Sequence, residues 1–177
     1  MSNFALILTF DWGTYGTPGF TGRFTSQEWS KDGGTPYPDF IAADLNIGDT
    51  MTIEIQPLAA NANLMVHQLT VIFAKEAGTG NEPCTPFRWT NLHIIPSVTT
   101  LLGMLVFTPG ATGSLASGSW VSTSCENTYP PTPEDGNLLT VATASVSAFK
   151  SILCAEIWDN NNNIAFFTHD PEMDINP

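Results

Sequence analysis

The residue types that most often carry catalysis are few in this sequence and lie far apart. The three histidines, His67, His93 and His169, are widely separated, and none has a second His or a Cys at metal-ligand spacing. The chain contains no Gly-x-Ser-x-Gly elbow, no phosphate-binding Gly-rich loop ending in Lys-Ser or Lys-Thr, and no His-Glu-x-x-His. Because 17 acidic residues bring some carboxylates together by chance, a glycosidase pair has no specific support. We predict that the protein is not an enzyme; a triad assembled from distant residues is the alternative left open.

An acidic and amide-rich stretch near the C-terminus suggests calcium chemistry. Asp159, Asn161 and Asn163 match the first three ligand offsets of a calcium-binding loop, and Asp170 falls at the twelfth. Ile164 stands where the sharp turn of such a loop needs Gly, so we interpret the match as accidental. The alternative is a looser Ca²⁺ site, and Ca²⁺ is the only candidate cofactor. Its candidate ligands are Asp159, Asn161, Asp170 and Glu172.

A Gly-rich segment, residues 11–40, holds many aromatic rings and shows no regular pattern, so we expect a long loop. Its rings either cover an open end of the fold or face a ligand. In the second case they would stack on the C–H faces of a sugar, as exposed aromatic rings do in lectins. The candidate ligand-binding residues are Trp12, Tyr15, Trp29 and Tyr37.

Length and charge limit the classes of partner. The 177 residues suffice for one domain, residues 1–177, and the 42% hydrophobic content predicts a folded core. The net charge of -12, with only 5 Lys and Arg, repels phosphate backbones and anionic lipid surfaces. We therefore expect no nucleic-acid partner. No apolar run approaches the length of a membrane span, so we expect no membrane insertion.

The elements that must position these residues are strands. Apolar residues alternate with polar ones over 51–56 and 65–73, and residues 4–10 are apolar throughout. His67 shares its side of the pattern with Met65 and Leu69, which predicts a hydrogen-bonded core histidine rather than a ligand. The pattern predicts an all-β protein, a two-sheet antiparallel β-sandwich of jelly-roll or immunoglobulin-like type with about 8–9 strands. Further predicted strands are 92–95, 101–107, 119–124, 138–148, 151–158 and 164–168, the last two forming a hairpin.

Cysteines and the N-terminal segment bear on the compartment. Cys154 lies in an apolar run and is predicted to be a buried thiol, whereas Cys84 and Cys125 lie in loops and could pair in an oxidising environment. Residues 1–10 lack the basic start, long apolar run and cleavage site of a secretory signal. We expect a cytoplasmic protein, with non-classical export as the alternative.

Three features taken in order resemble the bacterial inclusion-body protein family that includes PixA and AidA. They are an N-terminal apolar strand ending in Asp (Phe4–Asp11), the run Leu45–Asp49, and the closing hairpin followed by Asp170-Pro171 and a final Ile175. The chain departs from the family pattern in its longer ending and its longer aromatic segment. The resemblance implies a β-sandwich, cytoplasmic accumulation or ordered assembly, and no established enzymatic activity, and it carries over no catalytic residues.

Two functions therefore compete. The first is a non-enzymatic β-sandwich protein that associates with itself, as a homo-oligomer or an ordered assembly. Few Lys residues are available to protect sheet edges, which favours association through an edge or a face. We expect that assembly to strengthen with divalent cations or falling pH. The second is a carbohydrate-binding module or lectin that uses the aromatic segment, with Ca²⁺ at the acidic hairpin end.

Overall fold

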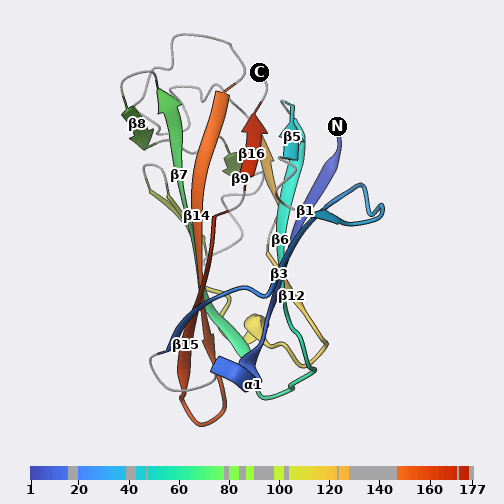
Figure 1. Ribbon diagram of the computed structural model, residues 1–177, viewed down its shortest axis with the longest axis vertical. Helices are drawn as coiled ribbons and strands as arrows, with labels where there is room; N and C mark the ends of the chain where they lie inside the picture. Colours follow the sequence, from blue (N-terminus) through green and yellow to red (C-terminus); the bar gives the residue numbers. More distant parts are fainter. Residues whose placement is uncertain are drawn as a thin grey trace.

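Two β-sheets face each other around one hydrophobic core (Figure 1). The computed structural model describes residues 1–15, 20–38, 43–46, 48–77, 80–83, 87–89, 98–101, 104–122, 124–127, 147–170 and 172–175. The seven-stranded sheet runs in the order β4-β3-β1-β6-β13-β9, with β12 also paired to β6. Its strands are β1 (Asn3–Phe10), β3 (Ser26–Lys31), β4 (Tyr37–Pro38), β6 (Thr50–Pro57), β9 (Phe87–Trp89), β12 (Trp120–Val121) and β13 (Cys125–Asn127).

The nine-stranded sheet has the path β10-β11-β7-β14-β15-β2, with β8 on β7 and β16 on β14, and β5 beside β16. Its strands are β2 (Phe20–Arg23), β5 (Ala43–Leu45), β7 (Met65–Ala77), β8 (Gly80–Pro83), β10 (Val98–Leu101), β11 (Met104–Phe107), β14 (Ser147–Trp158), β15 (Ile164–His169) and β16 (Glu172–Ile175). The described helices, α1 (Trp12–Tyr15) and η1 (Gly110–Gly113), are single turns of 4 residues, far too short to traverse a bilayer.

The predicted all-β, two-sheet sandwich is confirmed, with two differences in detail. The described residues form 16 strands instead of the predicted 8–9. The additional strands are β2 to β5 and several strands of two to four residues, which were not predicted because they lack a long alternating pattern. Three pairs are parallel rather than antiparallel: β1 with β6, β15 with β2, and β16 with β5. Alternation encodes which residues face inward but carries no information on strand direction. The predicted strands 92–95 and most of 138–148 lie outside the described residues.

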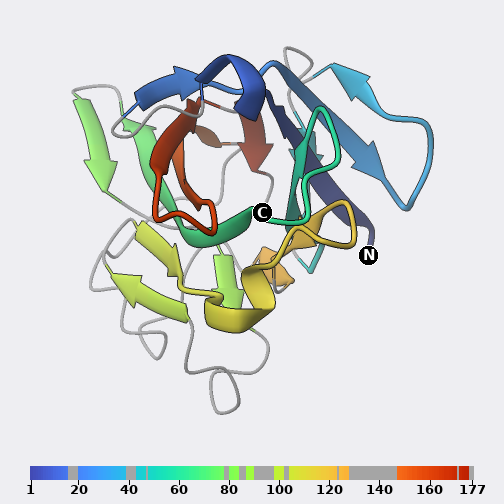
Figure 2. The ribbon, with the colours of Figure 1, turned by 90° about the horizontal axis from the view of Figure 1, so that it is seen from below.

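The core lies between the sheets and is built from alternate residues of the central strands. In β1 the buried side chains are Phe4, Leu6, Leu8 and Phe10, and β6 contributes Met51, Ile53 and Ile55. Opposite them, β14 and β15 lie across the core when the molecule is viewed from below (Figure 2). Three rings meet at one end of this interior, and their centroids are 4.8 Å (Phe10–Phe167), 5.8 Å (Phe24–Phe167) and 6.5 Å (Phe10–Phe24) apart.

The expected long loop over residues 11–40 is wrong. This segment contains α1, β2, β3 and β4, and β3 pairs antiparallel with β1 so that Trp29 lies opposite Leu6. The polar residues of β3 conceal its strand pattern, because only Trp29 and Ser30 of that strand are buried. β3 forms a strand although its sequence is mostly polar, because pairing with the apolar strand β1 supplies its backbone hydrogen bonds.

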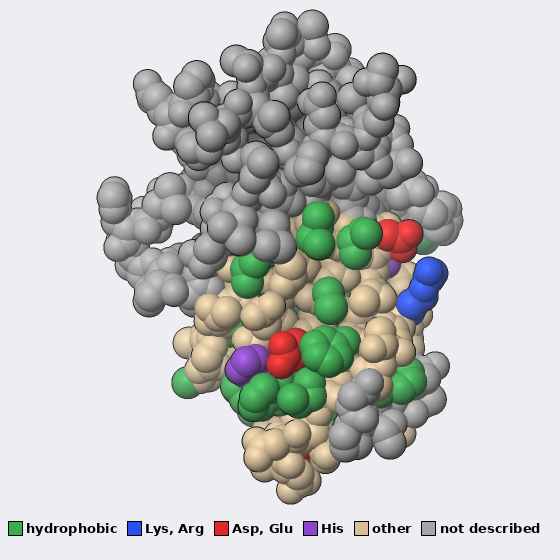
Figure 3. All heavy atoms as spheres, turned by 90° about the vertical axis from the view of Figure 1, so that its left-hand side faces the viewer, with side chains coloured by type: hydrophobic (Ala, Val, Ile, Leu, Met, Phe, Trp, Pro, Cys, Tyr) green, Lys and Arg blue, Asp and Glu red, His purple; other side chains and the backbone are tan. Residues whose placement is uncertain are grey.

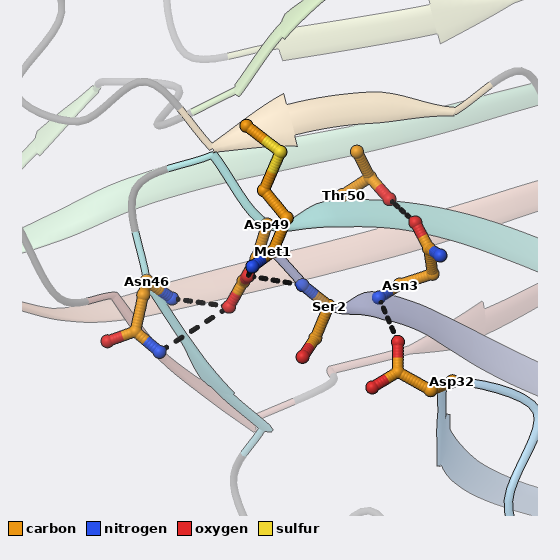
Figure 4. Close-up of polar contacts among 7 residues, drawn as sticks. All are labelled: Met1, Ser2, Asn3, Asp32, Asn46, Asp49 and Thr50. Atoms are coloured by element: carbon orange, nitrogen blue, oxygen red, sulfur yellow. Dashed lines mark hydrogen bonds and ion pairs between the residues drawn. The ribbon is translucent and has the colours of Figure 1, made fainter.

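The crossover from the nine-stranded sheet to the seven-stranded sheet is held by a buried carboxylate (Figure 4). Asn46 follows β5, and Asp49 precedes β6. One oxygen of Asp49 accepts the backbone N–H of Ser2 at 2.6 Å, and the other accepts the backbone N–H of Asn46 at 2.9 Å. Gly48 has a φ of 84°, a left-handed conformation that suits Gly in so tight a turn. Asp49 thus ties the crossover to the strand that β6 must pair with.

The surroundings of Asp49 determine its charge state. Burial raises the pKa of the Asp49 carboxyl, but the N–H donors of Asn46 and Ser2, the Asn46 side-chain amide and the terminal ammonium outweigh it. The net result is a pKa below the ordinary value for Asp. Beside it, Asn3 donates its N–H to Asp32 at 2.7 Å and accepts the Thr50 hydroxyl at 2.5 Å, so β1 is held from both sides (Figure 4).

Candidate functional site

The proposed calcium ligands do not come together. Asp159 begins the turn between β14 and β15, whereas Asp170 follows the last residue of β15. A six-residue strand is about 20 Å long, so these two carboxylates cannot bind one ion. The side chain of Glu172 lies outside the described residues. Within the described part of the chain no three His, Cys, Asp or Glu side chains lie close enough to hold a metal.

The carboxylate of Asp159 already organises its own turn. One oxygen accepts the N–H groups of Asn161 (2.8 Å) and Asn163 (2.9 Å), and the other accepts the Asn163 side-chain amide at 2.9 Å. The hydrogen bond from the Asn163 side chain is the main reason that the pKa of Asp159 is lowered. Desolvation is the next largest effect and opposes it, and the backbone donors of Asn163 and Asn161 lower the pKa further. These contacts are those of an Asx turn, in which the acid replaces a backbone acceptor. They agree with the interpretation that the match to a calcium-binding loop is accidental.

The proposed ligand-binding rings lie against the core. Trp29 is fully buried at 0% exposure, so its ring is not available for stacking on a sugar. Trp12 and Tyr37 are partly buried and pack on the core cluster, and burial raises the pKa of the Tyr37 hydroxyl. Tyr15 belongs to α1, and its side chain is outside the described set. The arrangement fits the first interpretation of the segment, in which its rings cover the fold.

A different surface stands out, which we call the outer face: the side of β7, β11, β14 and β15 that points away from the core. Alternation places Leu153, Ala155 and Ile157 of β14 in the core, and the residues between them outward. Figure 3 shows hydrophobic side chains spread over this side of the molecule, with an acidic and a histidine side chain adjacent among them. The partly or fully exposed residues of the outer face are Met65, His67, Gln68, Thr70, Ile72, Val106, Ile152, Cys154, Glu156, Trp158, Ile164, Phe166 and Thr168.

A β-bulge sets the position of His67, and the predicted core histidine is wrong. The register between β7 and β14 shifts between Glu156 and Ile157, so that Gln68 and Val66 have partners and His67 has none in the ladder. One extra residue reverses the alternation, so His67 and Gln68 both face outward while Leu69 remains in the core. The side chain of His67 is 43% exposed. A bulge of this kind leaves no mark in the hydrophobic pattern.

His67, Glu156 and Trp158 form a compact polar cluster on the outer face. Glu156 Oε1 accepts the indole N–H of Trp158 at 2.5 Å and lies 3.3 Å from His67 Nδ1. The imidazole and indole rings are stacked, with centroids 4.0 Å apart and planes 12° from parallel. Glu156 therefore accepts a hydrogen bond from Trp158, and it has a cationic partner as well when His67 is protonated. Nearby, burial and then the Glu156 charge raise the pKa of the Cys154 thiol, which is free and half-buried.

The two flanking isoleucines complete the surface. Ile72 and Ile152 are cross-strand partners, exposed by 46% and 56%. Residues 152–158 thus carry apolar side chains on both sides of β14, with Glu156 as the charged exception, and apolar residues on both sides are typical of a strand that is covered on both faces. Apolar residues on both sides of β14 are the sequence signal for the outer face. The strand predicted over 151–158 rested on its apolar content alone and not on this two-sided distribution. The side chains of Cys84 and Cys125, which could pair in an oxidising environment, lie outside the described residues.

Comparison with known proteins gives a match among solved structures alone. No family model matches the chain, and no curated protein is significantly similar to it. The crystal structure of an inclusion body protein, PixA, from Burkholderia cenocepacia J2315 is similar with a TM-score of 0.32. It shares 11% identity, and the alignment covers 98% of this chain and 94% of that one.

Proposed function

We propose that this chain is a non-enzymatic β-sandwich protein whose function is to associate with itself. The observation that supports it is the outer face, where the cross-strand pair Ile72 and Ile152 and the half-exposed rings of Trp158 and Phe166 lie on the adjacent strands β7, β14 and β15. Large apolar surfaces of this kind mark places where another molecule is bound. A cytoplasmic location, expected from the sequence, belongs to the same proposal.

The physical driving force is removal of apolar area from water. Each square ångström buried contributes about 25 cal/mol, before the cost of association is subtracted. The exposed parts of Ile72 and Ile152, with Phe166 and Ile164 on the neighbouring strand, are the main sources of such area. Opposing it is the net charge of -12, which makes identical molecules repel each other at low ionic strength.

Light scattering coupled to size exclusion tests the proposal. The unmodified chain is run over a wide concentration range in moderate salt, once with EDTA and once with millimolar Ca²⁺. We expect a defined species heavier than the 19.1 kDa chain in both buffers, because the described carboxylates do not gather into a calcium site. A strict monomer at every concentration and salt would refute self-association.

A further inference from the structure

We infer that the contact between copies is formed by two identical outer faces meeting about a two-fold axis, and that the Glu156 cluster sets its strength. This inference rests on the proposed function and specifies its geometry. It follows from three properties of the outer face: the apolar residues on both sides of β14, the charge of the face, and the partners of Glu156.

The first property is the apolar content of β14. Leu153, Ala155 and Ile157 are fully buried on one side, and Ile152 is 56% exposed on the other. Exposed Val121, on the seven-stranded sheet, lies instead beside Glu54 in the pairing of β12 with β6. The outer face therefore combines several apolar positions on adjacent strands, whereas Val121 stands next to an acid.

The second property identifies the occupant as another copy of this chain. The described charged side chains on and beside the outer face are Glu156, Arg23 on the edge strand β2 opposite Thr168, and Asp170 at the end of β15 (Figure 3). Their formal charges sum to -1, whereas the whole chain carries -12. A second copy that presented a typical part of its acidic surface would be repelled more strongly than one that presents this same weakly charged face. Self-complementary contact of one patch with itself is the commonest symmetry of homo-oligomers.

Two of the sheet edges offer a less suitable contact. β4 forms one end of the path of the seven-stranded sheet, and Pro38 within it lacks the N–H that an added strand would need. β2 forms one end of the other path and carries the exposed Arg23, a charge of the kind that protects edges. Contact through the face is therefore favoured over contact through β4 or β2, while β9 and β10 form the other ends of the two paths.

The third property concerns the cost of burying Glu156. A carboxylate that loses water in an interface destabilises it unless donors remain. The indole N–H of Trp158, 2.5 Å from Glu156 Oε1, is supplied by the same chain, so part of that cost is already met before association. The remaining charge still opposes contact with a second Glu156 across the two-fold axis. Replacing this acid with its neutral amide should therefore strengthen the contact.

Analytical ultracentrifugation of three variants tests the geometry. Ile152→Asp places a charge in the centre of the outer face, and Val121→Asp is the matched control at 52% exposure elsewhere. Glu156→Gln keeps an oxygen that can accept the Trp158 N–H. We expect Ile152→Asp to weaken the dimer at least about tenfold, Val121→Asp to leave it unchanged, and Glu156→Gln to tighten it severalfold. Thermal melting confirms that each variant is folded, which is expected because these side chains face water.

The outcomes separate the inference from the proposed function. If the unmodified chain is a monomer, self-association itself is refuted. If it associates but Ile152→Asp associates equally well, the outer face is not the contact and the inference alone fails. If Glu156→Gln weakens or does not change the dimer, the role assigned to the cluster is wrong. Association that continues past twice the chain mass and survives Ile152→Asp likewise overturns a closed two-fold contact.

Discussion

Asp49 is the residue on which the join between the two sheets depends. Its two oxygens accept hydrogen bonds from Ser2 in the segment leading into β1 and from Asn46 in the crossover, and its side chain is 5% exposed. We expect Asp49→Ala to reduce the free energy of unfolding by about 1–3 kcal/mol at pH 7, because buried donors lose their acceptor. Urea denaturation measures the change.

The same carboxylate makes stability depend on pH in a defined direction. Its pKa is lowered in the fold, so the unfolded chain binds the proton more readily and stability rises with pH. The contribution is fully present above the ordinary Asp pKa of about 3.9 and is lost as pH falls through the lower folded value. We expect Asp49→Asn to flatten the acid limb of the stability curve, whereas Asp32→Asn, at an exposed site, leaves it nearly as steep. An unchanged acid limb in Asp49→Asn would contradict this assignment.

Trp29 and Trp12 separate a core role from a binding role. Trp29 is fully buried, and Trp29→Ala should cost about 3–5 kcal/mol of stability because the neighbouring strands cannot fill the space. Trp12 is only partly buried, and Trp12→Ala should cost clearly less. Thermal melting compares the two. If both substitutions reduced stability equally and only slightly, the rings would not be part of the core, and the lectin hypothesis for the aromatic segment would be supported.

At the scale of elements, the β14–β15 hairpin is shaped by its turn. Asn162 has a φ of 58°, a left-handed conformation that Asn and Gly tolerate and β-branched residues resist. We expect Asn162→Val to lower stability by about 1–2 kcal/mol and Asn162→Gly to leave it almost unchanged. Both are measured by chemical denaturation. Since Asn162 is exposed, a large effect of the Gly variant would show that its side chain has a role the turn does not explain.

The β-bulge in β7 is the element-level feature with the widest consequence. It brings His67 over Trp158 and within 3.3 Å of Glu156, while Leu69 keeps its place in the core. Without the extra residue, the strand beyond it would turn its apolar side to water. The bulge thus lets β7 keep Leu69 in the core and place His67 on the outer face.

For the whole molecule, charge should control association. Lowering the pH from 8 toward 5 protonates part of the acidic surface, and the dimer should tighten severalfold as repulsion falls. The lowered pKa values of Asp49 and Asp159 keep these structural acids ionised across that range, so the fold persists. Sedimentation at several pH values measures the effect, and weaker association at pH 5 would contradict it.

Divalent cations should act on the same repulsion. At equal ionic strength, Mg²⁺ and Ca²⁺ should strengthen association equally, since Asp159 and Asp170 lie at opposite ends of β15. The comparison is made by light scattering. An effect of Ca²⁺ that Mg²⁺ does not reproduce would instead reveal a specific site.

The sequence by itself determined the class of fold and the inward-facing residues of its best strands. Alternation over β6 and β14, and the apolar run of β1, are local properties, because a strand sends successive side chains to opposite sides. The turn at Asp159 was likewise predictable, since an Asp followed by several Asn forms hydrogen bonds within a few residues.

Only the tertiary structure decided which residues meet. The parallel pairing of β1 with β6, the burial of Trp29 under β1, and the distance between Asp159 and Asp170 depend on partners remote in the chain. The position of His67 on the outer face follows from a register shift at a single residue, which changes the side on which a residue lies without altering the composition of the strand. Hydrophobic periodicity shows which residues of a strand lie on its apolar side. The location of a site depends in addition on which strands are neighbours and on the register in which they pair.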